Sequence, residues 1–443
     1  MKLFSKRKAL LLLTAFIMLF TSATVNVKAD TTWPTGPDVI ADTAIVMDAD
    51  TGAILYSKEM DQTMYPASIT KIMTCLLALE NGNLSDEVTM TETGVAYVEN
   101  GSSNAKTQVG EVFTLEQLLY GTMLKSANDM ATQVGEYIGG TIDNFVDMMN
   151  QRAKELGCKN THFNNACGMP DPDHYTTAYD MALICQAAVL REDFRTIVGT
   201  HSYTIPATNM TSTEREYTNH NPLLVDPTYA YPGIIGGKTG YTDSALNTLA
   251  TMVSQNGMTL ITVTFRNAQA GDAANDHINL YNWAYENFTK IEAENLEYVD
   301  SGGMATVPKE NTASDLTVTE TTDENGGVTS VYTLNGTQVG TSYKSAETLA
   351  KKAEDEASAS AAAEASAQAS EENNSARTDT SASKTKINPL VIILVIILCL
   401  IVALMIWMII AARIRAVRRR RRRKRRQELK RQQMRMQNQR RNK

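Results

Sequence analysis

Apolar residues between residues 38 and 288 repeat with the periods of strands and helices. The segment AIVMDADTGAILYS, residues 44–57, has two short alternating runs around Asp50-Thr51-Gly52. NTLATMVSQNGMTLITVTF, residues 247–265, alternates on both sides of Asn256-Gly257. Each pattern predicts two strands joined by a tight turn. Three segments between them show the apolar spacing of helices, namely residues 69–80, 114–125 and 176–190.

The third of these helical segments also carries a start signal. Thr177 stands three residues before Asp180, a spacing that resembles a capping box. We therefore expect a helix to begin at this point. With strands at both ends and helices between them, residues 30–288 are expected to form one α/β domain, in which helices flank a sheet that contains strands from both ends of the domain.

The pattern changes after residue 288. Residues 289–345 contain alternating runs interrupted by Gly and Asn, as in VYTLNGTQVGTSY, which predicts a small β-rich unit. Residues 346–388 consist mainly of Ala, Ser, Glu and Thr with almost no large apolar side chain. Such a composition cannot bury a core, so we expect a low-complexity stalk that is flexible or partly helical.

The two ends of the chain have the patterns of membrane targeting. Residues 1–29 combine basic residues, an apolar stretch from Ala9 to Phe20 and the small-residue pattern Val27-Lys28-Ala29, which predicts a cleaved signal peptide. An uncleaved anchor is the alternative, but the stretch is short for crossing a bilayer. Residues 389–412 carry no charge and are long enough for one transmembrane helix.

Charge is distributed very unevenly along the 443 residues. The net charge is −7, but the first 29 residues carry +5 and residues 413–443 carry 17 basic residues against Glu428, or +16. Subtracting both ends from −7 leaves −28 for the residues between them. Because positive residues stay on the cytoplasmic side, we expect a single-pass membrane protein with an extracellular working part and a cytoplasmic C-terminus.

The basic tail, residues 413–443, has three readings. It fits contact with anionic lipid or with a cytoplasmic partner. It also fits an exaggerated stop-transfer signal with no further role, and nucleic-acid binding is not expected.

Cysteine and histidine give little sign of cofactor chemistry. The four cysteines outside residues 389–412 form no CxxC pair and no dense framework. One disulfide is compatible with them, although buried or tolerated thiols fit the spacing better. The five histidines include no HExxH motif, so the sequence supports no metal site of that kind and we expect no cofactor.

A serine and a lysine stand three residues apart in YPASITKIMTCLLALE, at Ser68 and Lys71. If Ser68 lies in the first turn of a helix, both side chains share one face. A serine hydroxyl needs a base to become a strong nucleophile, and a lysine whose neutral form is favoured by burial can be that base. This spacing arises often by chance, so it predicts little on its own.

Two further motifs follow in order. They are Ser126-Ala127-Asn128 and Lys238-Thr239-Gly240. Separately, they could be a capped loop and a turn at a strand end. Together with the first motif they give S-x-x-K, S-x-N and K-T-G, the set of the penicillin-recognising serine acyl enzymes.

Residues 38–288 resemble the low-molecular-mass penicillin-binding proteins, the serine-type D-alanyl-D-alanine carboxypeptidases. The resemblance extends beyond the three motifs to VMDADTGAILYSKEMDQTMYPASITKIMT, GSSNAKTQVGEVFTLEQLLYGTMLKSANDMA, DPDHYTTAYDMA and GIIGGKTGYTDSA. It implies the serine β-lactamase/DD-peptidase-like fold. It also implies removal of the terminal D-alanine from peptidoglycan stem pentapeptides through an acyl-enzyme, with β-lactams as covalent inhibitors.

The resemblance assigns the catalytic roles as follows. Ser68 would be the acylated nucleophile and Lys71 its general base. Ser126 would relay a proton to the leaving amine. The backbone N–H groups of Ser68 and Tyr241 would form the oxyanion hole.

The remaining motif residues are assigned to the substrate. Asn128 would hold the peptide backbone, and Gly240 would allow the substrate to approach closely. Lys238 and Thr239 would bind the terminal carboxylate, for which a cation and a hydroxyl donor are suited.

Two other functions share features with this interpretation. A serine β-lactamase has the same three motifs, but we find no E-x-x-L-N stretch between the second and third motifs to activate a deacylating water. A non-catalytic membrane receptor for cell-wall peptide or β-lactam is the other alternative. The intact Ser68, Lys71, Ser126 and Lys238 argue against it.

Overall fold

A computed structural model describes residues 33–96 and 102–375, and the side chains of these residues up to 360. The predicted signal peptide, transmembrane helix and basic tail lie outside these residues, as does the last part of the predicted stalk. Within the described part, no helix is both long enough and apolar enough to span a bilayer.

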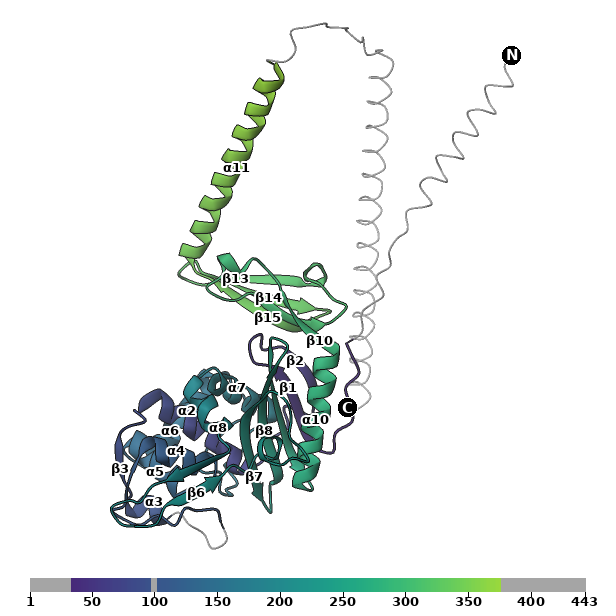
Figure 1. Ribbon diagram of the computed structural model, residues 1–443. Coiled ribbons are helices and arrows are strands. Elements are labelled where there is room, and N and C mark those ends of the chain that lie inside the picture. Colours follow the sequence, from purple (N-terminus) through teal and green to yellow (C-terminus); the bar gives the residue numbers. More distant parts are fainter. Residues whose placement is uncertain (1–32, 97–101, 376–443) are drawn as a thin grey trace, which may run out of the picture. The chain divides into compact units, whose positions relative to one another are not determined.

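A five-stranded antiparallel sheet forms the centre of the domain, in the order β2-β1-β9-β8-β7. Its first two strands come from the start of the domain and the other three from its end, as the alternating patterns predicted (Figure 1). The strands are β1 (Thr43–Asp48), β2 (Ile54–Lys58), β7 (Ile234–Thr242), β8 (Leu246–Gln255) and β9 (Met258–Asn267).

The turn between β8 and β9 lies where the sequence predicted it. Asn256 and Gly257 have φ values of 51° and 75°. Two successive residues with positive φ are required by the type I′ turn, whose twist matches that of the flanking strands. The turn fixes the register between β8 and β9. On its other side, β8 pairs with β7, which contains the K-T-G segment.

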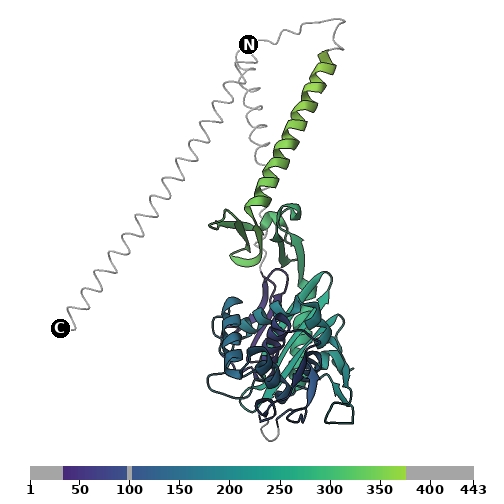
Figure 2. The ribbon, with the colours of Figure 1, turned by 90° about the vertical axis from the view of Figure 1, so that its left-hand side faces the viewer.

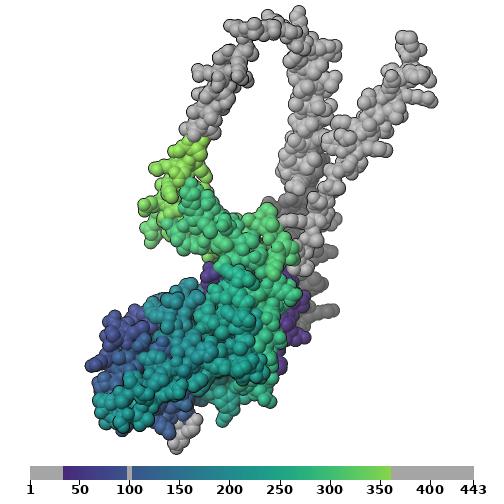
Figure 3. All heavy atoms as spheres, viewed as in Figure 1, coloured from purple at the N-terminus to yellow at the C-terminus, as the bar shows by residue number. Residues whose placement is uncertain are grey.

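The sheet separates two apolar cores, because alternate residues of a strand point to opposite faces. On β1, Ile45 and Met47 belong to the core shared with the helical region, whereas Ala44 and Val46 belong to the core under α10 (Ala270–Asn287). Figure 2 shows the helical region and the sheet from a second direction. In the space-filling view, they form one closely packed body (Figure 3).

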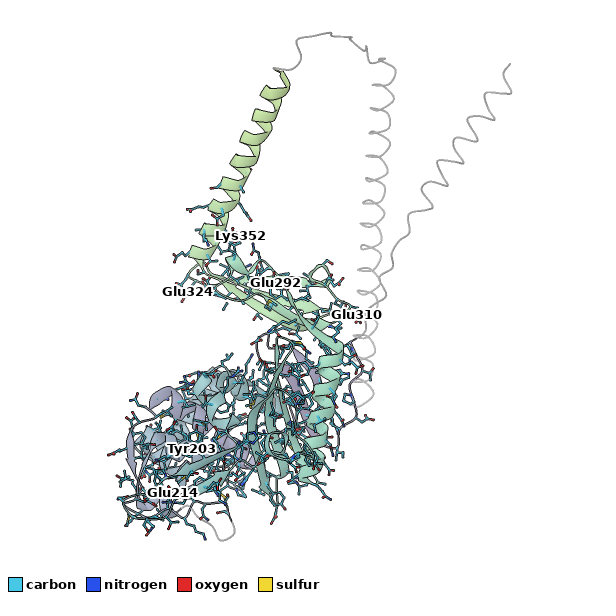
Figure 4. The ribbon with its side chains drawn as sticks, viewed as in Figure 1. Tyr203, Glu214, Glu292, Glu310, Glu324 and Lys352 are labelled. Atoms are coloured by element: carbon cyan, nitrogen blue, oxygen red, sulfur yellow. The ribbon has the colours of Figure 1, made fainter. Side chains whose placement is uncertain are left out.

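The helical region and its short strands occupy residues 67–225. Its helices are η1 (Ala67–Thr70), α2 (Lys71–Asn81), α3 (Glu92–Ala96), α4 (Leu115–Met123), α5 (Asn128–Gly139), α6 (Ile142–Glu155), α7 (Ala178–Val189), α8 (Glu192–Gly199) and α9 (Pro222–Val225). Two small two-stranded antiparallel sheets, β3-β4 and β5-β6, were not predicted. Their strands are β3 (Glu87–Thr89), β4 (Val112–Thr114), β5 (Ser202–Ile205) and β6 (Arg215–Thr218). Figure 4 labels Tyr203 in β5 and Glu214 directly before β6.

The predicted start of α7 is correct, but its chemistry differs from a reciprocal capping box. The Thr177 hydroxyl accepts a hydrogen bond from the Asp180 N–H and caps the helix. The Asp180 carboxylate instead accepts hydrogen bonds from the N–H groups of Lys159 and Asn160 and from the Thr161 hydroxyl. Asp180 therefore anchors the preceding loop to the helix.

Residues 288–344 contain two small antiparallel sheets, β10-β12 and β11-β15-β14-β13. The elements are β10 (Phe288–Glu292), η2 (Leu296–Tyr298), β11 (Ser301–Gly302), β12 (Met304–Pro308), η3 (Ala313–Asp315), β13 (Thr317–Thr322), β14 (Val328–Leu334) and β15 (Thr337–Lys344). Exposed Glu292, Glu310 and Glu324 mark this part of the chain in Figure 4. The Thr306 hydroxyl donates to Asp48 of β1 at 3.0 Å, so β12 is hydrogen-bonded to the main sheet's first strand.

The first part of the predicted stalk is a single helix, α11 (Ala346–Ser375). The four cysteines in the described residues, Cys75, Cys158, Cys167 and Cys185, are free thiols, as the spacing favoured. Among the described residues, no group of three or more His, Cys, Asp or Glu side chains is arranged to hold a metal ion.

Candidate active site

Ser68 lies in η1, which runs directly into α2 at Lys71. The backbone before it is unusual, because Ala67 has a φ of 50°, a conformation that non-glycine residues rarely adopt. The Thr248 hydroxyl of β8 donates to the carbonyl of Pro66 at 2.9 Å. The strand behind the turn thus fixes the segment that presents Ser68.

Lys71 is in hydrogen-bonding contact with Ser68, as the three-residue spacing predicted. Its Nζ lies 3.0 Å from Ser68 Oγ, 2.7 Å from Asn128 Oδ1 and 2.6 Å from the carbonyl oxygen of Cys167. The side chain is fully buried, with 0% of its surface exposed. Two acceptors from other segments, Asn128 Oδ1 and the carbonyl of Cys167, therefore hold the amine against the serine hydroxyl.

Burial changes the acid–base behaviour of this amine. Removal from water disfavours the charged form and lowers the pKa of Lys71 to about 8, although the negative charge of Asp129 raises the pKa. A substantial fraction of Lys71 is then neutral slightly above neutral pH. A neutral amine at 3.0 Å from a hydroxyl can accept its proton.

The loop that follows α6 supplies the third acceptor of Lys71. The side-chain oxygen of Asn165 accepts hydrogen bonds from the N–H groups of Cys167, Gly168 and Met169. This arrangement fixes the carbonyl of Cys167, which faces Lys71. No sequence motif predicted this loop, although the Asn-rich and Gly-containing stretch NNACGMP is typical of a side-chain-supported turn.

Asn128 is the first residue of α5, and its side chain joins two parts of the site. Its Oδ1 accepts from Lys71, and its Nδ2 lies 3.3 Å from the sulfur of Met169. Its backbone N–H donates to the carbonyl of Ser103. The turn before it contains Ser126, which is 6% exposed and has a φ of 60°.

The K-T-G segment lies in β7, next to the serine. A Cβ atom at Gly240 would lie 2.8 Å from the N of Ser68 and 2.4 Å from Thr248 Oγ1. Only a residue without a side chain allows β7 to approach the serine turn this closely. The neighbouring Tyr241 is 59% exposed, so it borders the site from the solvent side.

Lys238 is 2% exposed, and its Nζ donates to the carbonyl of Thr239 at 3.0 Å. Burial, with a further contribution from the positive charge of Lys71, lowers its pKa well below the ordinary value. A carboxylate placed beside it would favour the charged form and raise the pKa again. Lys238 is thus a buried amine near Lys71 that a bound carboxylate would charge.

A cavity of about 460 Å³ opens in front of these groups. Three of the predicted residues line it, namely Ser68, Asn128 and Tyr241. Its other walls are Ser102, Ser103, Gly168, Met169, Pro170, Thr242, Asp243 and Ser244. Lys71 and Lys238 lie behind this surface. Within the described part of the chain, neither the Ser126 nor the Thr239 hydroxyl hydrogen-bonds to Ser68 or Lys71.

His174 and Thr70, which no sequence motif indicated, are two buried groups that support the serine turn. His174 Nδ1 accepts a hydrogen bond from the N–H of Asn164, so the proton of the neutral ring lies on Nε2. That nitrogen can donate to the hydroxyl of Thr70, 2.9 Å away. Burial lowers the pKa of His174 to about 4, so the ring stays neutral near pH 7. A lone histidine gave no signal of this kind in the sequence.

The comparisons with known proteins agree on the domain. A family model described as Peptidase S11, D-alanyl-D-alanine carboxypeptidase, matches residues 30–269. D-alanyl-D-alanine carboxypeptidase DacF of Bacillus subtilis (strain 168) is 36% identical over 244 residues, which cover 52% of this chain and 60% of that protein. DacA of Haemophilus influenzae is 32% identical over 262 residues, which cover 57% and 64% of the two chains. The chain thus spans less than two thirds of the length of these two relatives.

Solved structures show the same architecture. The crystal structure of the Streptomyces K15 DD-transpeptidase is 31% identical, with a TM-score of 0.53, and it matches over 57% of this chain and 100% of its own length. The fold is therefore the DD-peptidase/β-lactamase-like α/β fold that the motifs predicted. Because the family model covers more than half of the residues, the chain belongs to the S11 family of serine peptidases, the D-alanyl-D-alanine carboxypeptidases.

Proposed function

We propose that the chain is a serine D-alanyl-D-alanine carboxypeptidase that removes the terminal D-alanine from peptidoglycan stem pentapeptides. One observation carries the proposal most directly. A buried lysine whose pKa is about 8 lies 3.0 Å from the hydroxyl of a serine at the wall of an open cavity. This pair has the composition and geometry of an activated nucleophile.

Acylation begins with proton transfer from Ser68 Oγ to the neutral Nζ of Lys71. The freed oxygen attacks the carbonyl carbon of the penultimate D-alanine, and the N–H groups of Ser68 and Tyr241 receive the developing oxyanion. Collapse of the intermediate breaks the peptide bond and leaves an ester on Ser68. The departing amine of D-alanine takes a proton relayed through Ser126.

The remaining motif residues orient the peptide. Asn128 holds its backbone, and Lys238 with Thr239 binds the terminal carboxylate. The close approach of Gly240 to Ser68 supports this orientation, because it places β7, an edge strand of the sheet, directly beside the serine turn. The acidic middle of the chain does not oppose an anionic substrate, since charges beyond about 10 Å are largely screened and the two lysines act at short range.

Water then hydrolyses the acyl-enzyme. Transfer to an amine is the alternative fate of the ester. β-Lactams would acylate the same serine and remain attached as inhibitors. The family and its named members are carboxypeptidases, so neither a β-lactamase nor a non-catalytic receptor is favoured.

We further propose that this domain works outside a bacterial cell membrane. The signal-peptide pattern of residues 1–29 and the uncharged segment 389–412 support a single membrane crossing. The 17 basic residues that follow support a cytoplasmic C-terminus, which would contact anionic lipid or a cytoplasmic partner.

The test uses the extracellular part of the chain and a peptide ending in D-Ala-D-Ala. Release of free D-alanine, compared with formation of cross-linked product, measures hydrolysis against transfer. A fluorescent penicillin should form a covalent adduct that mass spectrometry places on the peptide containing Ser68. No release of D-alanine, or label that persists on a Ser68→Ala protein, would overturn the proposal.

A further inference from the structure

A second hollow lies beside the candidate active site. It has a volume of about 310 Å³ and is lined by Thr63, Met64, Tyr65, Pro172, Tyr175 and Arg266. Arg266 is its only charged lining residue, and Tyr65 is 40% exposed. None of the three catalytic motifs reaches this hollow, so the mechanism above leaves it unused.

The hollow and the active-site cavity are built from the same segments. Residues 168–170 line the cavity, and Pro172 and Tyr175 of the same loop line the hollow. The segment before α2 contributes Ser68 to the cavity and Tyr65 to the hollow. The hollow and the cavity are therefore lined by neighbouring parts of the same two segments.

A hydrogen bond connects the two spaces on the third side. Arg266 Nη1 donates to the carbonyl oxygen of Ser244 at 2.8 Å, and Ser244 lines the active-site cavity. Arg266 Nε donates to Asp42 Oδ2 at 2.9 Å. Within the described residues, Nη2 makes no hydrogen bond. The guanidinium is thus held in position with one edge available to a ligand, and its side chain is 40% exposed.

The order of residues along β7 gives the direction of a bound peptide. Lys238, the proposed carboxylate site, lies at one side of Gly240, which contacts the serine turn, and Ser244 lies on the other side. Ser244 lies in the turn that follows β7, four positions beyond Gly240. A peptide whose C-terminus meets Lys238 and whose scissile carbonyl meets Ser68 therefore extends its N-terminal part toward Ser244 and Arg266.

We infer that the Arg266 hollow is a subsite for a carboxylate in the acyl part of the stem peptide. The inference rests on the proposed carboxypeptidase function. Four acyl residues span up to about 14 Å, and Tyr65, which lines this subsite, stands only three positions before Ser68. Two carboxylates of a stem peptide fit the chemistry, the α-carboxylate of γ-linked D-glutamate and the free carboxylate of meso-diaminopimelate. Arginine's planar fork suits either one.

The experiment compares kcat/KM on four substrates for the wild type and for Arg266→Gln. The substrates are diacetyl-L-Lys-D-Ala-D-Ala, the pentapeptide L-Ala-γ-D-Glu-meso-diaminopimelyl-D-Ala-D-Ala, the same pentapeptide with the D-glutamate carboxylate amidated, and the same with L-lysine at position three. In the variant, the ratio of kcat/KM on the acidic pentapeptide to kcat/KM on the diacetyl peptide should fall about 5- to 20-fold. If amidation of D-glutamate removes this fall, Arg266 binds the D-glutamate carboxylate. If L-lysine at position three removes it, Arg266 binds the carboxylate of meso-diaminopimelate.

Several controls separate a subsite from a structural role. Gln and Arg meet similar backbone strain at the φ of 61° found at position 266, so the substitution adds little of its own. Arg152→Gln, which removes another partly exposed arginine that pairs with Glu80, should leave the ratio unchanged. Asp42→Asn removes the charge that opposes Arg266 and should raise the ratio about twofold. Equal losses on all four substrates would mean that Arg266 only supports Ser244, and no change in the ratio would also overturn the subsite.

Failure of the subsite can be distinguished from failure of the proposed function. Calorimetric binding of the same peptides to Ser68→Ala protein, with and without Arg266→Gln, needs no turnover. Weaker binding of the acidic peptide alone supports the subsite even if the wild type releases no D-alanine. If the wild type releases D-alanine but Arg266→Gln does not weaken peptide binding to the Ser68→Ala protein, the subsite is wrong and the proposed function stands.

Discussion

The pH dependence of acylation tests the central pair directly. If Lys71 removes the proton of Ser68, the first-order acylation rate of the bound complex follows the neutral fraction of Lys71. With a pKa of about 8, the neutral fraction is about 3% at pH 6.5, about 50% at pH 8 and about 90% at pH 9. The rate should therefore rise about 30-fold from pH 6.5 to pH 9 and then level.

The sign follows from the direction of the shift. Burial lowers the pKa of Lys71, so raising the pH removes the proton that blocks it from acting as a base. A lysine at its ordinary value of 10.5 would instead give a rise of about 300-fold over the same range without levelling. The shape of the profile thus distinguishes a buried base from an exposed one.

The assay is stopped-flow fluorescence with a fluorescent penicillin at saturating concentration. Saturation separates the acylation step from binding, which is important because Lys238 titrates as well and has a lowered pKa. Loss of the Lys238 charge at high pH should weaken binding without changing the plateau of the acylation step. A rate that does not change between pH 6.5 and pH 9 would refute the assignment of Lys71 as the base, and a rate that increases about 300-fold without levelling would refute its lowered pKa.

The remaining predictions concern single residues. Lys71→Ala should slow acylation by about 10²–10⁴-fold or more while a thermal melt stays nearly unchanged, and acylation close to the original rate would place the base elsewhere. Lys238→Ala should lower kcat/KM on acyl-D-Ala-D-Ala by about 10- to 150-fold, since a charge-assisted pair contributes about 1.5–3 kcal/mol. The same change should harm a substrate with an amidated C-terminus much less; equal losses on both would exclude the carboxylate role. Gly240→Ala adds a Cβ 2.8 Å from the N of Ser68, so penicillin acylation should fall at least about 10-fold, and an unaffected rate would show that β7 can move away from the serine turn.

Local patterns predicted the elements that local forces determine. The turn at Asn256-Gly257, the strands around Asp50-Thr51-Gly52 and the start of α7 at Thr177 lie where the sequence indicated. Each depends on residues within a few positions of one another. The contact between Ser68 and Lys71 belongs to the same class, because three residues along a helix place both side chains on one face.

Contacts between distant segments could not be read in the same way. The carbonyl of Cys167 that faces Lys71 is 96 residues away in the chain, and any residue type supplies a carbonyl. The Asp180 carboxylate was expected in a capping box, but it instead anchors residues 159–161, which no local rule indicates. The side chain of Lys238 is buried, although lysine composition alone favours exposure.

Burial explains how one site can use two lysines for opposite tasks. Both side chains are removed from water, and burial lowers both pKa values, that of Lys238 with help from the charge of Lys71. Lys71 has three neutral acceptors around its Nζ, none of which requires the amine to carry a charge. Lys238 would gain a formal anion when the substrate carboxylate arrives, which favours its protonated form. A protonated Lys238 next to Lys71 further disfavours a charge on Lys71. However, because the carboxylate and the protonated Lys238 together carry no net charge, their pairing would charge Lys238 while leaving burial to keep Lys71 neutral.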